Sequence, residues 1–351
     1  MASPDPMLIR RSSAPMLLPD QPWEAGGACM AVAAFAAAHG LLLYYAVRFR
    51  DRPLDNVLCL AQSDDGREWR KPDCGDGTNI VMRSAGRQND WGIFSPNTIL
   101  HEPDDPDPAQ RWKMLYWDRP DAAMPSGYCL AVSADGRSWT RLHDRPVITG
   151  ANDAGSLIGM WPGLRTPCNA GSHLILQQTL RFNPALPAER DNLKHLHRQI
   201  SVWQCEQFTG RWVGPVQVLG PDAADAPDLQ FYWLAPFKTP AGSYGGFLNC
   251  HHTTDQTMDV QLVSSRDGWS WTREHNRRPI LTLGPTGRFD CGMVSVLAAP
   301  VPWADRLLVF YNGRATVHDG RPHEADRPLP EPPQGIGMAE FAPGLLDLAP
   351  A

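Results

Sequence analysis

Five acidic residues recur at intervals of about 62 to 75 residues, each just before a short apolar segment: Glu24, Asp90, Asp153, Asp228 and Asp290. Four of them open the pattern acid-x-Gly, and two extend it to Asp-x-Gly-x-x-Ser, from Asp90 to Ser95 and from Asp290 to Ser295. Carboxylates that face one pocket raise one another's pKa. That arrangement is costly unless the pocket uses them for acid–base chemistry, a metal ion or sugar hydroxyls.

Cleavage of a glycosidic bond needs such groups, because one carboxyl protonates the leaving oxygen while another acts as nucleophile or activates water. We predict that Asp90 and Asp290 act at the scissile bond, with Glu24 or Asp153 as the partner acid or base. Asp228, whose segment lacks the glycine, is predicted to bind substrate, with a structural role as the alternative. Two alternatives stay open: each carboxylate caps the backbone amides of its strand, or the ring holds a hard cation such as calcium. The chemistry itself requires no cofactor.

A second repeat, Ser-x-Asp-Gly-x-x-Trp, occupies residues 63–69, 133–139 and 265–271, and a degraded copy ends at Trp212. Asp-Gly allows a positive φ, the Ser and Asp side chains bond nearby backbone, and Trp buries a large face. The repeat is therefore predicted to end the outer hairpin of each structural unit. We assign no catalytic role to its aspartates.

Between these turns the chain reads as short apolar or alternating runs, separated by Gly, Pro and Asn, which predicts strands. Five sets of three runs, each followed by a short outer strand, predict an all-β fold, a single five-bladed β-propeller domain over residues 1–351. The blades are expected at roughly 21–75, 88–145, 152–215, 227–278 and 288–345. The apolar segment missing after the fifth blade is found at residues 16–18, so the N- and C-terminal segments are expected to meet and close the ring.

A carboxylate on each central strand and Ser-x-Asp-Gly-x-x-Trp turns on the outer hairpins resemble the five-bladed glycosidase superfamily. It includes the arabinanase/xylosidase and invertase/levanase families, and the resemblance covers Trp23 to about Phe341. The invertase signatures Asn-Asp-Pro-Asn-Gly and Arg-Asp-Pro do not occur in the sequence. The resemblance implies a nucleophile or base near Glu24, a pKa-tuning residue near Asp90 and an acid near Asp153. It implies an enzyme that hydrolyses a small oligosaccharide or glycoside.

Further side chains near the predicted channel mouth are candidates for binding this carbohydrate, with core packing as the alternative for the aromatic ones. They are Trp91, Trp161, Arg165, Tyr232, Trp233, His251, Ser95 and Ser295.

Two other functions stay open. One is a non-catalytic carbohydrate-binding propeller, and the other is a glycoside phosphorylase that uses phosphate in place of water. Phosphorolysis would need basic residues at the mouth. Arg87, Arg165 and Arg314 are the candidates, with a solvated surface role as the alternative.

Composition narrows the class of partner and the compartment. The formal net charge of −6 argues against nucleic acid or an anionic membrane surface as a partner. The eight cysteines are scattered without Cys-x-x-Cys spacing, which favours free thiols in a reducing compartment, and we expect a cytoplasmic protein. Residues 28–47 carry no formal charge and have the length of a membrane span. We interpret them instead as two buried strands joined at His39-Gly40.

Overall fold

The computed structural model describes residues 7–85, 94–162, 172–184, 191–325 and 327–348. Regular structure in these ranges consists of β-strands and short 3-10 turns, without an α-helix. The turns are η1 (Pro22–Glu24), η2 (Pro53–Asp55), η3 (Pro108–Gln110), η4 (His275–Arg277) and η5 (Pro343–Leu346). Within the same ranges, no helix is both long and apolar enough to cross a membrane.

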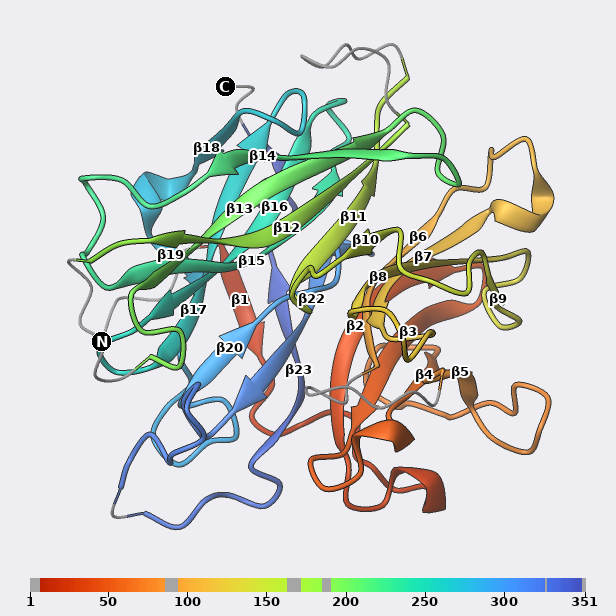
Figure 1. Ribbon diagram of the computed structural model, residues 1–351. Helices are drawn as coiled ribbons and strands as arrows, with labels where there is room; N and C mark the ends of the chain where they lie inside the picture. The colour runs from red at the N-terminus through yellow and green to blue at the C-terminus, as the bar shows by residue number, and fades with distance from the viewer. Residues whose placement is uncertain (1–6, 86–93, 163–171, 185–190, 326, 349–351) are drawn as a thin grey trace.

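The strands form antiparallel groups that follow one another around the molecule in chain order (Figure 1). The first group contains β2 (Ala28–Ala37), β3 (Gly40–Arg48), β4 (Val57–Ser63) and β5 (Ile80–Arg83). The second contains β6 (Ser95–His101), β7 (Trp112–Asp118), β8 (Gly127–Ser133), β9 (Thr140–Arg141) and β10 (Ile148–Thr149). The third contains β11 (Gly155–Gly159), β12 (His173–Phe182), β13 (Leu196–Cys205) and β14 (Trp212–Leu219).

Two more groups complete the described strands. The fourth contains β15 (Leu229–Lys238), β16 (Tyr244–His252), β17 (Thr257–Ser265), β18 (Trp271–Arg273) and β19 (Pro279–Leu281). The last contains β20 (Met293–Ser295), β21 (Val301–Trp303), β22 (Arg306–Arg314), β23 (Gln334–Phe341) and the N-terminal β1 (Leu8–Arg11). A single parallel bridge between Met258 and Met293 joins these two groups into one sheet.

The uncharged segment 28–47 is a hairpin, as predicted from its central His-Gly pair. Strands β2 and β3 pair from Ala28↔Arg48 to Ala37↔Gly40. Gly40 has a φ of +111°, and a Cβ at this position would lie 2.1 Å from the carbonyl oxygen of Ser63. Both the backbone conformation and the close approach of β4 therefore require glycine.

The N-terminal segment pairs with the C-terminal strand, as the sequence predicted. Strand β1 is antiparallel to β23, and the two lie side by side in Figure 1. Leu17 forms an isolated bridge with Ile336, within the apolar segment 16–18 that was expected to meet the C-terminus. Leu17 is buried, so this contact adds apolar burial to the backbone pairing.

The core is divided into hydrophobic clusters that lie between neighbouring groups of strands. One cluster contains Tyr44 from the first group and Trp112 from the second. Another contains Phe310 from the last group and Leu43 from the first, so the last group packs against the first. The first strands of successive groups also contact one another, β2 with β6, β6 with β11 and β11 with β15. The first strands of four groups therefore lie next to one another in chain order.

Buried asparagines connect neighbouring groups of strands. Asn97 Nδ2 donates to the carbonyl oxygens of Asp153 and Gly155, at 2.7 and 3.1 Å. Asn312 Oδ1 accepts from the backbone N–H of Ala31 at 2.7 Å, and Asn249 Oδ1 accepts in the same way from Val296 at 2.7 Å. Each side chain satisfies backbone groups that no strand partner reaches. These links fix the ends of the inner strands where the candidate site lies.

The three Ser-x-Asp-Gly-x-x-Trp turns have one shared geometry. In each, the Ser hydroxyl oxygen accepts the Gly N–H, at 2.8, 3.0 and 2.8 Å. The Asp Oδ1 accepts the backbone N–H groups of the second and third residues after it, at 2.7 to 2.9 Å. All these bonds span at most three residues. The turns are therefore structural, as predicted.

Candidate functional site

A cavity of about 180 Å³ lies where the inner strands begin. Its wall combines the ends of strands from several groups with the segment that follows β22. The polar and aromatic residues in the wall include Arg48, Ser95, Asp153, Tyr232, Trp233, Ser295, Asn312, Arg314 and His318. Among the predicted site residues, the structure thus brings together Asp153, Ser95, Ser295, Tyr232 and Trp233.

Asp153 is the one carboxylate that the described residues contribute to this wall. Its side chain is 40% exposed, and its Oδ2 lies 3.6 Å from Arg48 Nη2. The same nitrogen donates to Ser95 Oγ at 2.9 Å, so the guanidinium is held by β6 as well. At 3.6 Å the ion pair is loose and solvated, which leaves the carboxylate accessible to a ligand.

Glu24 and Asp290 lie outside the cavity, in buried ion pairs. Glu24 is 0% exposed; its carboxylate accepts from Tyr45 OH at 2.5 Å and contacts Lys71 Nζ at 2.5 Å. Asp290 is 1% exposed and has the same kinds of partner, Tyr311 OH at 2.8 Å and Arg11 Nη2 at 2.6 Å.

A charge is costly to bury unless it is paired and hydrogen-bonded. Each of these carboxylates is paired with one cation and hydrogen-bonded to one phenol. These surroundings favour a structural role for both acids, in contrast to the catalytic role that the sequence pattern predicted. The pattern acid-x-Gly alone does not distinguish the two.

Three other predicted binding residues also lie outside the cavity wall. Asp228 Oδ2 accepts the backbone N–H of Thr254 at 3.2 Å, a local contact. Trp161 donates to the carbonyl oxygen of Ser243 at 3.0 Å. His251 lies behind Tyr232, with ring centroids 5.9 Å apart. Asp90, Trp91, Arg87 and Arg165 lie outside the described residues, so the roles predicted for them stay predictions.

The two cavity aromatics differ in what they offer a ligand. Trp233 is 8% exposed and donates its indole N–H to Ser156 Oγ at 2.6 Å, so it mainly packs in the core. The Tyr232 hydroxyl lies 3.2 Å from His318 Nε2. Burial raises the pKa of Tyr232 to about 12, and nearby Asp153 adds to the rise. Tyr232 is therefore a neutral hydroxyl at the wall.

Arg48 and Arg314 make the wall basic, and the sequence analysis missed Arg48. Arg314 donates to Thr316 Oγ1 at 3.3 Å and forms no ion pair with a carboxylate in the described ranges. Burial lowers the pKa of Arg314, and the nearby charges of Arg48 and Arg50 lower it further. Arg48 could have been found from the sequence, because it is the last residue of the hairpin 28–48. The open end of that hairpin lies at the cavity.

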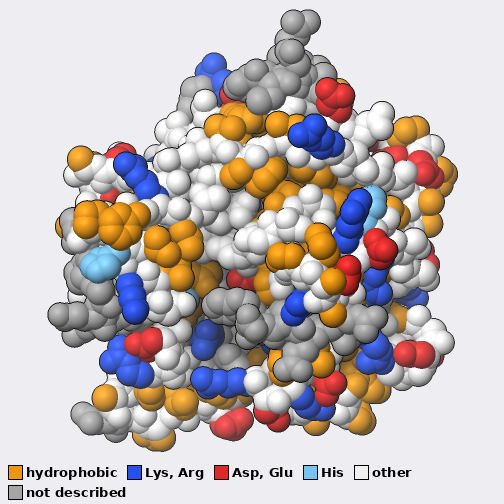
Figure 2. All heavy atoms as spheres, viewed as in Figure 1, with side chains coloured by type: hydrophobic (Ala, Val, Ile, Leu, Met, Phe, Trp, Pro, Cys, Tyr) orange, Lys and Arg blue, Asp and Glu red, His pale blue; other side chains and the backbone are white. Residues whose placement is uncertain are grey.

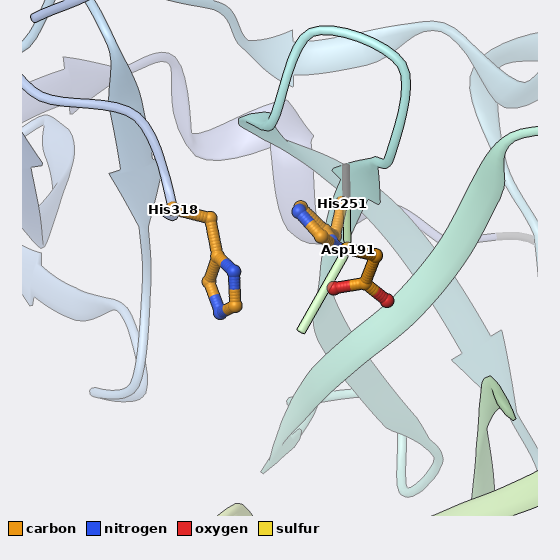
Figure 3. A group of neighbouring side chains, drawn as sticks. All are labelled: Asp191, His251 and His318. Carbon is orange, nitrogen blue, oxygen red and sulfur yellow. The ribbon is translucent and has the colours of Figure 1, made fainter. Parts of the chain in front are cut away.

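Beside Tyr232 lies a cluster of two buried residues and the half-buried His318, which the sequence indicated only through His251. Asp191, His251 and His318 place one potential metal-ligand atom each within 4.8 Å of the others (Figure 3). Arg198, 1% exposed, forms a bidentate pair with Asp191 at 2.6 and 3.0 Å. Burial lowers the pKa of His318 to about 4 and that of His251 well below its usual range. Both imidazoles are therefore neutral at pH 7.

The outer surface does not indicate a particular function. On the face shown in Figure 2, acidic and basic side chains are interspersed with hydrophobic ones. This mixture agrees with the modest net charge of −6.

No protein-family model matches the chain, and no curated protein matches it in sequence. Solved structures match its fold. A glycoside hydrolase is 12% identical with a TM-score of 0.63, over 98% of this chain and 94% of that one. A structure from the GH130 family of mannoside phosphorylases, described as containing glycoside hydrolases that target β-1,2 mannosidic linkages in Candida mannan, is 13% identical with a TM-score of 0.61. The match covers 100% of this chain and 97% of that chain.

An N-acetylgalactosamine deacetylase from F. plautii, in complex with blood group B trisaccharide, is 12% identical with a TM-score of 0.60. That match covers 96% of this chain and 97% of that chain. At these identities the similarity shows the fold. The chain has the propeller-like fold of these glycoside hydrolases, which the resemblance in sequence pattern predicted. Because a deacetylase shares the fold, the reaction has to be argued from the site.

Proposed function

We propose that this protein cleaves glycosidic bonds, as a hydrolase of a small oligosaccharide or glycoside bound in the central cavity. The observation that carries this proposal is the position of Asp153. It is an accessible carboxylate in a cavity whose other walls offer hydroxyls, an aromatic ring and guanidinium groups. Sugar sites combine such polar groups with aromatic faces. The fold neighbours support the proposal because they include glycoside hydrolases.

In this mechanism Asp153 is the acid that protonates the leaving oxygen, the role that the resemblance assigns to the third blade. A second carboxylate must act as nucleophile or activate water. Asp90 remains our prediction for it, because its repeat position precedes β6, and Ser95 at the start of β6 lines the cavity. Arg48, held by its 2.9 Å bond to Ser95, would place a guanidinium beside Asp153 and the substrate.

A screen of 4-nitrophenyl glycosides tests the proposal directly. Release of nitrophenol by the wild-type protein, lost in the Asp153→Asn variant at unchanged melting temperature, is the expected result. If sugars bind but no glycoside is turned over, the protein is a non-catalytic carbohydrate-binding propeller, and the proposal is wrong.

Phosphorolysis is the second candidate, and Arg314 favours it. A largely buried guanidinium with no carboxylate partner in the described ranges, beside the guanidinium of Arg48, suits an oxyanion. Turnover that requires inorganic phosphate and yields a sugar 1-phosphate would establish a phosphorylase. Turnover in phosphate-free buffer that yields the free sugar would exclude it.

We further propose that the groups of strands are the five blades predicted over residues 21–75, 88–145, 152–215, 227–278 and 288–345. The support is that each hydrophobic cluster lies between two successive groups, and that the last group packs against the first. An experimental density map with a different number of sheets around the axis would contradict this assignment.

Two compositional predictions accompany the proposal. A central calcium ion takes about six to eight oxygen ligands, whereas the described cavity wall offers one carboxylate. Metal analysis of the purified protein decides this point.

The cytoplasmic location rests on the cysteines, and the seven in the described ranges are free thiols. Cell fractionation with a thiol assay checks it.

A further inference from the structure

The described wall of the central cavity carries more positive than negative charge. Its charged side chains at pH 7 are Arg48, Arg314 and Asp153. His318 also lines the cavity, but burial lowers its pKa to about 4, so its imidazole adds no charge at this pH. Two guanidinium groups against one carboxylate leave one positive charge without a counterpart in the described wall.

Arg314 is the clearer case of an unpaired charge. It is the last residue of β22, and its backbone pairs with Met293 on β20 and with Gln334 on β23, which fixes its position. Its guanidinium donates to Thr316 Oγ1 at 3.3 Å and forms no ion pair with a carboxylate in the described ranges. A guanidinium has about five N–H donors, so most of them are left for a ligand. A half-buried charge without a counter-ion is costly, which indicates a missing anion.

Arg48 reaches the same cavity from the neighbouring group of strands. Its Nη2 donates to Ser95 Oγ at 2.9 Å and lies 3.6 Å from Asp153 Oδ2. Its Nη1 meets the thioether of Met30 at 3.9 Å, which is a weak acceptor. Besides burial, the charge of Arg48 lowers the pKa of Arg314, so the two guanidinium groups repel each other. An anion bound between them offsets this repulsion.

The count of charges favours an anion with a single negative charge. One carboxylate supplies the one charge that the described wall lacks. A phosphate group carries about −1.5 to −2 charges at pH 7, so it would leave an excess of negative charge beside Asp153. A second catalytic carboxyl does not change this balance, because glycoside cleavage uses one carboxyl protonated and the other ionised.

We propose that Arg48 and Arg314 bind a carboxylate of the substrate sugar, so that the substrate is a glycoside of a uronic acid. The planar guanidinium groups match a carboxylate in shape and in the number of donors. The hydroxyl groups of Tyr232 and Ser295 in the same wall are left for the hydroxyls of the sugar. The identity of the substrate rests on the proposed function, whereas the anion subsite rests on the arginines alone.

The test is sugar binding by the full-length protein, measured by calorimetry in phosphate-free buffer at pH 7. The probes are D-glucuronate, D-galacturonate and D-mannuronate, each compared with the neutral hexose of the same configuration. We expect at least one uronate to bind at least about tenfold more tightly than its hexose, the scale of one charge-assisted hydrogen bond. If no uronate binds more tightly than its hexose, the proposal is wrong.

Arg314→Gln and Arg48→Gln should each lower the ratio of uronate affinity to hexose affinity by about tenfold. A purely structural defect would weaken both sugars and leave this ratio unchanged. Two variants keep the test decisive if one of them does not fold. Arg50→Gln is the matched control, because Arg50 follows Arg48 by two residues but is exposed and lies outside the cavity wall. Its ratio should change by less than about twofold, and an equal fall in all three variants would contradict the subsite.

Inorganic phosphate, the co-substrate of the second candidate function, is titrated separately. Binding of phosphate that depends on Arg314, without preference for any uronate, would assign the arginines to phosphate and overturn this inference. Turnover of 4-nitrophenyl uronides and neutral glycosides separates the two proposals. If uronates bind as expected but no glycoside is cleaved, the proposed function is wrong and the anion subsite stands. Cleavage of neutral glycosides without preference for uronides would support the proposed function and contradict this inference.

Discussion

The outer turns and the central acids are both repeats in the sequence, but only the turns keep one geometry in all three copies. In the three turns a Ser and an Asp make the same bonds to backbone groups at most three residues away. The four described acids do not share one geometry. Glu24 and Asp290 are buried in ion pairs, Asp153 faces the cavity, and Asp228 binds a neighbouring loop. A repeat fixes geometry where its interactions are local, and leaves it open where the partners come from distant segments.

The largest effect that this comparison predicts is at Arg11. In Arg11→Ala, Asp290 keeps its burial of 1% exposure but loses the cation at 2.6 Å. We expect the free energy of unfolding to fall by about 3 to 5 kcal/mol, as for other broken buried pairs. Urea unfolding followed by circular dichroism measures the loss.

Arg10→Ala is the control on the same strand. The Arg10 side chain is 52% exposed, and its partner Glu340 also pairs with Arg306, so the loss should stay below about 1 kcal/mol. Similar small losses in both variants would mean that Asp290 does not depend on its ion pair, and the structural role of this acid would be wrong.

Trp139→Ala addresses the turns. The Trp139 indole N–H donates to Gly136 at 3.1 Å, and the ring packs against the cluster between the first two groups. We expect a loss of about 3 kcal/mol, at the lower end for Trp because the ring is partly exposed. Turnover per folded molecule should be unchanged, whereas Arg137→Ala, an exposed change in the same turn, should alter neither. A folded Trp139→Ala protein without activity would contradict the claim that the turns are structural and that function depends on the central cavity.

Acid titration should reveal a further buried charge pair, around Glu102. Burial raises the pKa of this carboxyl, but His173 and Lys113 more than offset the rise and lower it to about 2. Because the folded pKa is lower than the ordinary one, the stabilisation is present above about pH 4.5 and is lost as the pH falls toward 2. At pH 7 the free energy of unfolding of the wild-type protein should exceed that of Glu102→Gln by about 2 kcal/mol. If this difference in stability stayed constant from pH 7 to pH 3, the charge of Glu102 would not be its cause.

The smallest effects are expected from the turn aspartates. Asp65→Ala, Asp135→Ala and Asp267→Ala each remove an acceptor of two backbone N–H groups. We expect small, nearly equal drops in the urea midpoint, each below that of Trp139→Ala. Clearly unequal drops would contradict the shared geometry of the turns.

The parts of the fold that could be predicted from the sequence are those that depend on local chemistry. The hairpin of residues 28–48, the three turns and the meeting of residues 16–18 with the C-terminal strand follow from patterns within a few residues or from a missing apolar segment. The buried asparagines at 97, 249 and 312 could not be predicted, because the backbone groups that they bind belong to neighbouring groups of strands.

The site was predicted less well for the same reason. Asp153 and Ser295 were placed at the cavity, but nothing near Glu24 in the sequence reveals that Tyr45 and Lys71 enclose it. Whether an acid is paired or accessible depends on which distant side chain reaches it. A search for basic residues at the ends of inner hairpins would have found Arg48.

The most direct test of this account compares turnover in two variants, Asp153→Asn and Asp290→Asn, on a glycoside that the wild-type protein cleaves. Asp153→Asn should unfold at the wild-type urea concentration and lose at least about a hundredfold in kcat, the usual scale for loss of acid–base catalysis. Asp290→Asn should be less stable, yet its folded molecules should keep near wild-type kcat. The account would be contradicted if Asp153→Asn retained its kcat while folded Asp290→Asn lost it.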